Sequence, residues 1–360
     1  MRTGTNSNSD DNNFNGLRFF AAMAVVLSHS FTLATGNPLN EPLTSALGIN
    51  IGHIAVDIFF VSSGFLVTSS LLRSNTIGEF LLFRALRVFP ALWTLLIITV
   101  FLIGPLLSSL SAIEYFSKFE TYKYLIQNAI LIFGANYYLP GFFETAPYPM
   151  VVNGSLWSLP IEIRMYLILA CIWAGLSIIN RKTTSNLRMV AWVVFLSCTV
   201  IAVYHYVTGQ EVGNFFRLGG MFFSGVLLKT YKEKIIIPWW GGLLLVLATV
   251  VAAADTRFFL MVYSITSPFL VIFVAHCKIP VISNIYIKDD VSYGVYVYSF
   301  PVQQIIVLSI PGVAPINTFL YSALVTLPIA FLSWRLVESK ILKLKGKFRK
   351  NTPLIPLATA

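Results

Sequence analysis

The stretch Ile54–Leu72, IAVDIFFVSSGFLVTSSLL, decides the class of fold. It carries a single charged side chain, that of Asp57, and as a helix it is long enough to cross the hydrocarbon core of a bilayer, which takes roughly 20 residues. The whole chain agrees with it: 56% of the 360 residues are hydrophobic, 11% are charged, and the mean hydropathy is +0.76. Soluble domains carry about 25% charged residues, so a water-soluble globular protein is excluded.

Ten apolar runs of this length follow one another along the chain, and each predicts one transmembrane helix. A closed β-barrel would show short alternating segments instead. We therefore predict an all-α polytopic membrane protein with the lipid bilayer as its surroundings. The ten runs are Leu17–Ala34, Ile54–Leu72, Val88–Leu110, Ser155–Ile179, Met189–Val207, Val212–Leu228, Ile235–Ala254, Phe258–Ala275, Val291–Ile310 and Ile316–Trp334.

The basic residues predict the orientation, because cytoplasmic loops carry an excess of Lys and Arg. With the N-terminus in the cytoplasm, 20 of the 25 lysines and arginines lie on the cytoplasmic side, and only Lys118, Lys123 and Arg257 lie outside. The stretch Tyr124–Tyr138 is apolar but short, and an eleventh crossing there would reverse every later loop. We therefore predict a re-entrant or interfacial segment at this place, and two cytoplasmic termini.

Composition divides the chain into a polar cytoplasmic N-terminus (1–16), a membrane domain (17–338) and a basic cytoplasmic tail (339–360). No small-residue cleavage site follows the first apolar run, so we expect a retained span and not a signal peptide. The tail accounts for much of the net charge of +10. Because basic runs beside a span commonly face anionic lipid, we expect this contact and no nucleic-acid partner.

Ionisable side chains within the spans are the first candidates for chemistry, because a charge near the centre of a bilayer costs at least about 2.5 kcal/mol. The predicted topology places all of them in the outer half of the bilayer. A histidine beside a carboxylate can act as a general base, and His29 with Asp57 or Glu162 fits this pattern. Pairing that merely joins helices is an equally good interpretation. The set comprises His29, Asp57, Glu162, Arg164, His205 and Arg217.

The sequence predicts neither a protein nucleophile nor a metal site. It has no Gly-x-Ser-x-Gly elbow, and its His and Cys residues lack the spacing of metal ligands. The cysteines, Cys171, Cys198 and Cys277, show no paired spacing, so no disulfide is expected either.

Three arginines lie at the predicted cytoplasmic edge of the spans. Arg18 precedes His29 by eleven residues, which places both on one helical face roughly 16 Å apart. Arg84 and Arg87 are three residues apart and also share a face. Such a pair can hold phosphates through charge-assisted hydrogen bonds, although topology-setting charge is the commoner explanation for the pair alone.

Four strings that contain these residues resemble the acyltransferase-3 family of integral membrane acyltransferases, which includes O-antigen acetylases. Their order and spacing match that family across the chain, and Asp290–Tyr296 and Arg335–Glu338 extend the likeness to the last spans. The strings are Leu17-Arg18-Phe19-Phe20-Ala21 running to His29, Val56-Asp57-Ile58-Phe59-Phe60-Val61-Ser62-Ser63-Gly64-Phe65, Arg84-Ala85-Leu86-Arg87-Val88-Phe89-Pro90, and Ser155-Leu156-Trp157-Ser158-Leu159-Pro160-Ile161-Glu162 with Tyr166.

The resemblance implies transfer of an acyl group, commonly acetyl, to a hydroxyl of a carbohydrate or glycoconjugate such as lipopolysaccharide or another cell-surface polysaccharide. The implied donor is acyl-coenzyme A, acting as a substrate, with no bound cofactor. The implied location is the bacterial inner membrane, and Arg18, Arg84 and Arg87 become the expected donor-binding groups.

The same resemblance makes His29 the expected catalytic base, which would take the proton of the acceptor hydroxyl as that hydroxyl attacks the thioester. Asp57 or Glu162 would orient the imidazole, and the residues alone do not decide between them. Ser63 and Trp157 are expected to line the acceptor pocket.

Two alternatives stay open. A glycolipid or polysaccharide transporter or flippase would use the same charges as a substrate path, would move its substrate unmodified and would need no acyl donor. If the chain is an acyltransferase, a second question concerns the acceptor step. About 25 residues follow the last predicted span. The membrane domain is therefore expected either to complete the transfer or to pass the acyl group to a separate extracytoplasmic protein.

Overall fold

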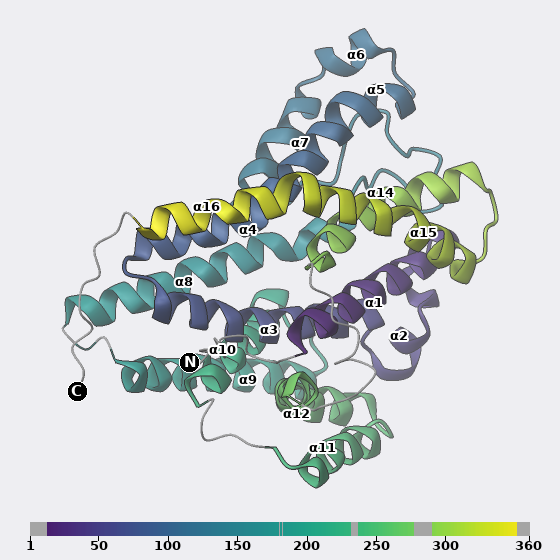
Figure 1. The fold of residues 1–360 in the computed structure, drawn as a ribbon. Helices are drawn as coiled ribbons and strands as arrows, with labels where there is room; N and C mark the ends of the chain where they lie inside the picture. Colours follow the sequence, from purple (N-terminus) through teal and green to yellow (C-terminus); the bar gives the residue numbers. More distant parts are fainter. Residues whose placement is uncertain (1–12, 180, 182, 232–236, 277–289, 351–360) are drawn as a thin grey trace, which may run out of the picture.

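The protein is described by a computed structural model that covers residues 13–179, 181, 183–231, 237–276 and 290–350. Every regular element in that part of the chain is a helix, and none is a strand. Figure 1 shows long helices lying side by side across the molecule. The predicted all-α polytopic class is confirmed.

Each of the ten predicted spans overlaps a helix, and the span predicted over Val88–Leu110 begins within α4 and runs through the π-helical turn Ile98–Ile103 and the short helix that follows it. Seven helical segments of the described chain are long and apolar enough to cross a membrane by length and composition. The span predicted over Ile235–Ala254 begins in the segment 232–236, which lies outside the described residues. The ten helices are α1 (Phe14–Thr35), α3 (Ile51–Arg73), α4 (Ile77–Ile97), α8 (Leu159–Ile178), α9 (Thr184–Thr208), α10 (Asn214–Thr230), α11 (Trp239–Ala252), α12 (Thr256–His276), α14 (Ser292–Ser309) and α15 (Pro315–Ser333).

Three of these helices, α10, α11 and α14, are too short or too polar to belong to the seven. In α14 the polarity faces inward. Its Gln303 and Gln304 are fully buried and donate to the backbone carbonyls of Val26 and Tyr148 over 2.7 and 2.8 Å. The amide nitrogens are thus satisfied inside the bundle, whereas both amide oxygens are buried without a partner among the described residues. Polar side chains that face the interior of the bundle in this way are compatible with surrounding lipid.

Helix α3 lies at the centre of the bundle, between α1 and α10. Its contact with α10 depends on two glycines. A Cβ built on Gly64 would lie 1.9 Å from the carbonyl oxygen of Phe222, and one built on Gly225 would lie 2.1 Å from that of Val61. Small residues that let two backbones touch are typical of helix contacts within membranes, so this sequence feature fixes the crossing of α3 and α10.

The connections alternate between two ends of the bundle. In Figure 1 the chain turns on the left between α3 and α4 and again between α8 and α9. It turns on the right through the short helices η1 (Pro38–Asn40) and α2 (Pro42–Leu47), and again between α14 and α15. This alternation agrees with successive crossings in opposite directions.

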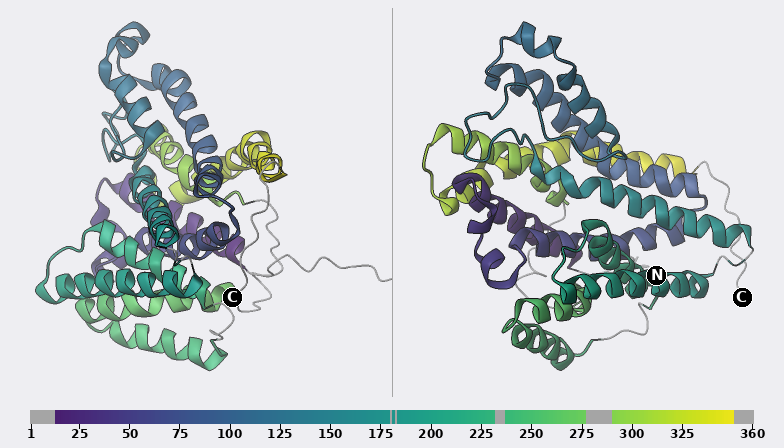
Figure 2. Two further views of the ribbon diagram at one scale, coloured as in Figure 1. Left: turned by 90° about the vertical axis from the view of Figure 1, so that its left-hand side faces the viewer. Right: turned by 180° about the vertical axis from the view of Figure 1, so that it is seen from behind.

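A projection leaves the bundle where α4 continues through a π-helical turn, Ile98–Ile103, into α5 (Gly104–Leu107). Helices α6 (Ala112–Ser117) and α7 (Phe119–Ile130) complete it, and both views of Figure 2 show it standing apart from the other helices. The stretch 124–138 therefore ends one helix and continues without regular structure. A twelve-residue helix spans roughly 18 Å, which is too short to cross the hydrocarbon core, as predicted.

At the other end of the chain, α15 continues through a second π-helical turn, Trp334–Glu338, into α16 (Ser339–Lys350). The boundary predicted between the membrane domain and the basic tail thus falls within one continuous helical segment. Helix α16 packs against α4. This contact brings the beginning of the tail to the arginine-bearing part of α4.

Candidate active site

A cavity of about 500 Å³ lies between α1, α3, α4, α8 and the start of α14, and we call it the inner cavity. Its wall includes Asn15, Arg73 and Ser74, which lie at helix ends on the predicted cytoplasmic side, and Lys345 of α16. Its volume is in the range of small-molecule sites. Five cationic side chains outnumber two carboxylates in its wall: Arg18, Arg73, Arg84, Arg87 and Lys345 against Glu162 and Asp290.

The three arginines predicted to bind the donor meet in this cavity, although they come from two helices. Capping fixes the beginning of α4: Thr76 Oγ1 accepts from the backbone N–H of Glu79 at 3.0 Å, and Glu79 Oε2 accepts from that of Asn75 at 2.8 Å. From this start, Arg84 and Arg87 lie two and three turns along α4. Arg18 faces them from the first turns of α1.

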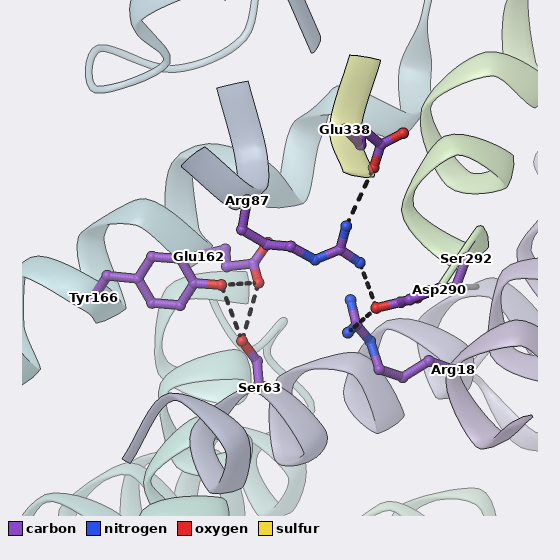
Figure 3. Close-up of polar contacts among 8 residues, drawn as sticks. All are labelled: Arg18, Ser63, Arg87, Glu162, Tyr166, Asp290, Ser292 and Glu338. Atoms are coloured by element: carbon purple, nitrogen blue, oxygen red, sulfur yellow. Dashed lines mark hydrogen bonds and ion pairs between the residues drawn. The ribbon is translucent and has the colours of Figure 1, made fainter. Parts of the chain in front are cut away.

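Arg18 and Arg87 share one carboxylate (Figure 3). Asp290, two residues before α14, accepts from Arg18 Nη1 at 2.9 Å and from Arg87 Nη2 through the same oxygen, Oδ2. Its other oxygen accepts from the hydroxyl of Ser292. Burial would raise the pKa of Asp290, but the two guanidiniums outweigh it and hold that pKa below its ordinary value. The carboxylate is therefore ionised at neutral pH.

Arg87 has a second carboxylate partner. Its Nη1 lies 3.2 Å from Oε2 of Glu338, whose side chain is only 2% exposed. The π-helical turn at the end of α15 brings this glutamate in, and Ser333 Oγ donates to its other oxygen over 3.2 Å. Arg84 differs: Nη2 donates to Ser70 Oγ over 3.3 Å, its buried Nε has no partner, and it forms no ion pair with any residue the structure describes.

Glu162 lies in the same cavity, in a group with two hydroxyls (Figure 3). Ser63 Oγ donates to Glu162 Oε1 over 3.0 Å, and the Tyr166 hydroxyl donates to the same oxygen. The two hydroxyl oxygens lie 3.1 Å apart. Asn153 at the start of the 3-10 turn Gly154–Ser158 holds the beginning of α8 by donating to the carbonyl of Val297 over 2.8 Å. This contact positions Glu162 in the first turn of α8.

His29 does not line the inner cavity. Its ring lies edge-on to Phe300 with the centroids 5.1 Å apart, its Nδ1 is buried without a hydrogen-bond partner among the described residues, and the residue as a whole is partly exposed. His53 and Trp157 pack nearby, edge to face, with centroids 5.8 Å apart, and His53 lies within electrostatic range of His29. We call His29, His53, Trp157 and Phe300 the outer histidine group.

The structure does not join His29 to either predicted carboxylate. Asp57 forms an ion pair with Arg217 of α10 and accepts from the Tyr263 hydroxyl over 3.0 Å. Glu162 is bonded to Ser63 and Tyr166, in the wall of the inner cavity. No carboxylate therefore orients the imidazole as expected. Asp57 is paired with Arg217 of α10 and Glu162 is bonded to Ser63 of α3, and the sequence alone did not predict either contact.

Ser63 and Trp157 were expected to share one pocket, and the structure separates them. Ser63 lies in the inner cavity, whereas Trp157 packs against His53 and is not part of that wall. Sequence reasoning also missed His53, which lies one residue before the predicted span, and Asp290 and Glu338, which lie just outside two others. Only the strings that extend the family likeness pointed to the two acids.

Among the described residues, no group of three or more His, Cys, Asp and Glu side chains is arranged to hold a metal ion. Cys171 and Cys198 are free thiols, and Cys277 lies outside the described part of the chain.

Comparison with known proteins identifies the family of this chain. The family model described as an acyltransferase domain, that of the acyltransferase-3 family, matches residues 11–335. The chain belongs to the acyltransferase-3 family. It is thus an O-acyltransferase and a multi-pass membrane protein, and its membership argues against the transporter alternative.

Three relatives illustrate the family. An O-acetyl transferase of Shigella phage Sf6 is 31% identical over 92% of this chain and 96% of its own length. Nodulation protein 10 of Rhizobium leguminosarum bv. viciae is 28% identical over 94% of this chain and 95% of its length. The peptidoglycan O-acetyltransferase OatA of Listeria monocytogenes is 27% identical over 54% of this chain, which covers 29% of that protein. No solved structure matches the chain significantly.

Proposed function

We propose that the protein transfers an acetyl group from acetyl-coenzyme A to a hydroxyl of a cell-surface carbohydrate, at the inner membrane of a bacterium. The observation that carries the proposal is the inner cavity, where Arg18, Arg84 and Arg87 converge at the predicted cytoplasmic end of the bundle. The printed names of two relatives, an O-acetyl transferase and a peptidoglycan O-acetyltransferase, support acetyl as the acyl group and a carbohydrate as the acceptor.

The cavity suits the phosphorylated end of the donor. Coenzyme A carries several phosphate charges, and cations are in excess in the wall. Guanidiniums bind phosphate oxygens with charge-assisted and often bidentate hydrogen bonds. We assign Ser63, Glu162 and Tyr166, in the same wall, to the donor side as well, which replaces the acceptor role expected for Ser63 from sequence.

We assign the acceptor side to the outer histidine group. The acceptor oxygen would form its bond with the thioester carbonyl carbon while His29 takes the proton of that hydroxyl. The carbon–sulfur bond then breaks, and the departing thiolate takes the proton from the imidazolium, which yields an O-acetyl ester and coenzyme A. His29 is partly exposed as a residue, and its buried Nδ1 has no partner in the described structure. Both observations support a proton-transfer role over a helix-joining one.

We further propose that the membrane domain completes the transfer without a separate extracytoplasmic protein. The phage O-acetyl transferase supports this, since the match covers 96% of its length. Purified protein in detergent, given acetyl-coenzyme A with a labelled acetyl group and an oligosaccharide from the envelope of the source cell, should form labelled O-acetyl ester with no other protein added. Donor hydrolysis without sugar labelling, or unchanged surface glycans by mass spectrometry in cells lacking the protein, would contradict the proposal.

A further inference from the structure

The three arginines of the inner cavity differ in how their charge is balanced. Arg87 has two carboxylate partners, Asp290 and Glu338, and Arg18 shares the first of them. Arg84 has a hydroxyl partner, Ser70, and no carboxylate among the described residues. The three side chains therefore do not present the same surface to an anion.

Arg87 is held on every side. The rings of Tyr293 and Trp334 lie 5.7 and 5.6 Å from its guanidinium carbon, in addition to the two carboxylates. Asp290 is itself fixed, because Ser292 donates to the oxygen that the arginines do not use. Both terminal nitrogens of Arg87 are already paired, so an anionic ligand that contacted its remaining N–H groups would meet the negative charges of Asp290 and Glu338 at close range.

Arg84 is the opposite case. It has no ion-pair partner in the described structure, and the carboxylate that acts on it electrostatically, that of Glu162, is already bonded to Ser63 and Tyr166. A cation that is largely removed from water and lacks an ion-pair partner is costly, and an anionic ligand lowers that cost. Its buried Nε has no partner, and its side chain lines the cavity. Arg73 also lines the cavity without an ion pair in the described structure, but it is exposed at the last residue of α3, so water already solvates it.

We propose that Asp290 is a positioning residue, which clamps Arg18 and Arg87 and so joins α1 and α4 to the start of α14, and that Arg84 is the arginine which contacts a phosphate of the donor. This inference rests on the proposed function, which supplies coenzyme A as the ligand. It divides arginines that the sequence treated alike into one that binds and two that hold the wall of the cavity in place.

The binding role of Arg84 is tested with two probes, coenzyme A and pantetheine, which lacks the phosphates. In Arg84→Gln the dissociation constant of coenzyme A, measured by titration calorimetry on purified protein, should rise about ten-fold or more, because a charge-assisted hydrogen bond is lost. The dissociation constant of pantetheine should stay unchanged. The control is Arg335→Gln, an exposed arginine outside the cavity, which should bind both probes as the wild type does.

The positioning role of Asp290 is tested by a double-mutant cycle. Arg87→Gln leaves Glu338 without its arginine partner and Asp290 with Arg18 alone, which adds net negative charge beside the donor, so coenzyme A binding should weaken. Adding Asp290→Asn removes one of those charges, and the double variant should recover to within about three-fold of Asp290→Asn alone. Asp290→Asn added to Arg84→Gln should bring no recovery.

The outcomes separate the claims. If Arg84→Gln binds coenzyme A as tightly as the wild type, or if the Arg87→Gln and Asp290→Asn double variant stays as weak as Arg87→Gln, the inference is overturned while the proposed function stands. If the wild type itself does not bind coenzyme A, the proposed function fails and the role of Arg84 fails with it. The clamp is also tested by the unfolding temperatures of the wild type, Arg87→Gln, Asp290→Asn and the double variant. The change in the double variant should be smaller than the sum of the two single changes, and additive changes would contradict the clamp.

Discussion

Near one end of α1, Arg18 is held by a carboxylate from the start of α14, and near the other end His29 keeps a buried nitrogen without any partner in the described structure. Beside the inner cavity, ion pairs join four segments of the chain: α1, α4, the start of α14 and the π-helical turn after α15. The outer histidine group is held by ring packing, and its polar atoms are left available. Under the proposed function, the first region holds the charged donor in place and the second exchanges a proton.

The largest expected effect comes from the outer group. His29→Ala should lower the turnover of acyl transfer by about 10²- to 10⁴-fold, the usual contribution of a general base. Coenzyme A binding should stay close to that of the wild type, since His29 does not line the inner cavity. Turnover and binding are to be measured on the same purified protein. Substantial turnover by the variant would show that the outer group does not supply the base.

The second effect concerns stability. Asp57→Asn breaks the buried ion pair with Arg217, and loss of one partner of such a pair costs about 3–5 kcal/mol. We expect less folded protein and a lower unfolding temperature, with turnover per folded molecule largely kept. Asp57→Asn combined with Arg217→Gln should recover part of the stability. Normal stability with lost turnover would instead support the role in orienting His29 that the sequence suggested for Asp57.

A smaller effect is expected in the inner cavity. Ser63→Ala removes one of the two hydroxyl groups that bond to Glu162, while Tyr166 remains. Hydrogen bonds to a charged group contribute about 1.5–3 kcal/mol, so kcat/KM for the donor should fall about 10- to 150-fold. The KM for the acceptor should not change. If the acceptor KM rises and the donor KM does not, Ser63 belongs to the acceptor side, as the sequence alone had indicated.

The smallest effect concerns pH, because the stabilisation that Asp290 provides should hardly change near neutral pH. The pKa of Asp290 is held below its ordinary value, so its ion pairs stabilise the fold at every pH above that ordinary value and are lost only as pH falls through the lowered one. The difference in unfolding temperature between the wild type and Asp290→Asn should therefore stay constant from about pH 8 to pH 5. A difference that shrinks already near pH 6 would mean that the clamp is weaker than the structure indicates.

The fold was largely predictable, because apolar length alone selects membrane helices and all ten predicted spans overlap helices. The meeting of Arg18, Arg84 and Arg87 was also within reach, since all three lie at the same predicted edge. The pairing of Asp57 with Arg217 was not, because it joins residues 160 positions apart and depends on the glycine-mediated packing of α3 against α10.

Other parts of the site escaped for a different reason. A charged residue stands out in a sequence when it lies within an apolar span, where burial makes the charge costly. Asp290 and Glu338 lie just outside the predicted spans, although their ion pairs hold them inside the bundle. A π-helical turn places Glu338, and this irregularity leaves no trace in hydrophobic periodicity. His53 was missed by one residue at a predicted helix end, where boundaries are least certain.

The division of the protein into a donor region and an acceptor region is tested most directly by sidedness. Purified protein is placed in liposomes, its orientation is determined by proteolysis of the basic tail, and labelled acetyl-coenzyme A is supplied on one face only. We predict that carbohydrate is acetylated when the donor is on the face that carries the tail, where the inner cavity opens. Transfer that occurs only with the donor on the opposite face, beside α2 and the outer histidine group, would contradict the account.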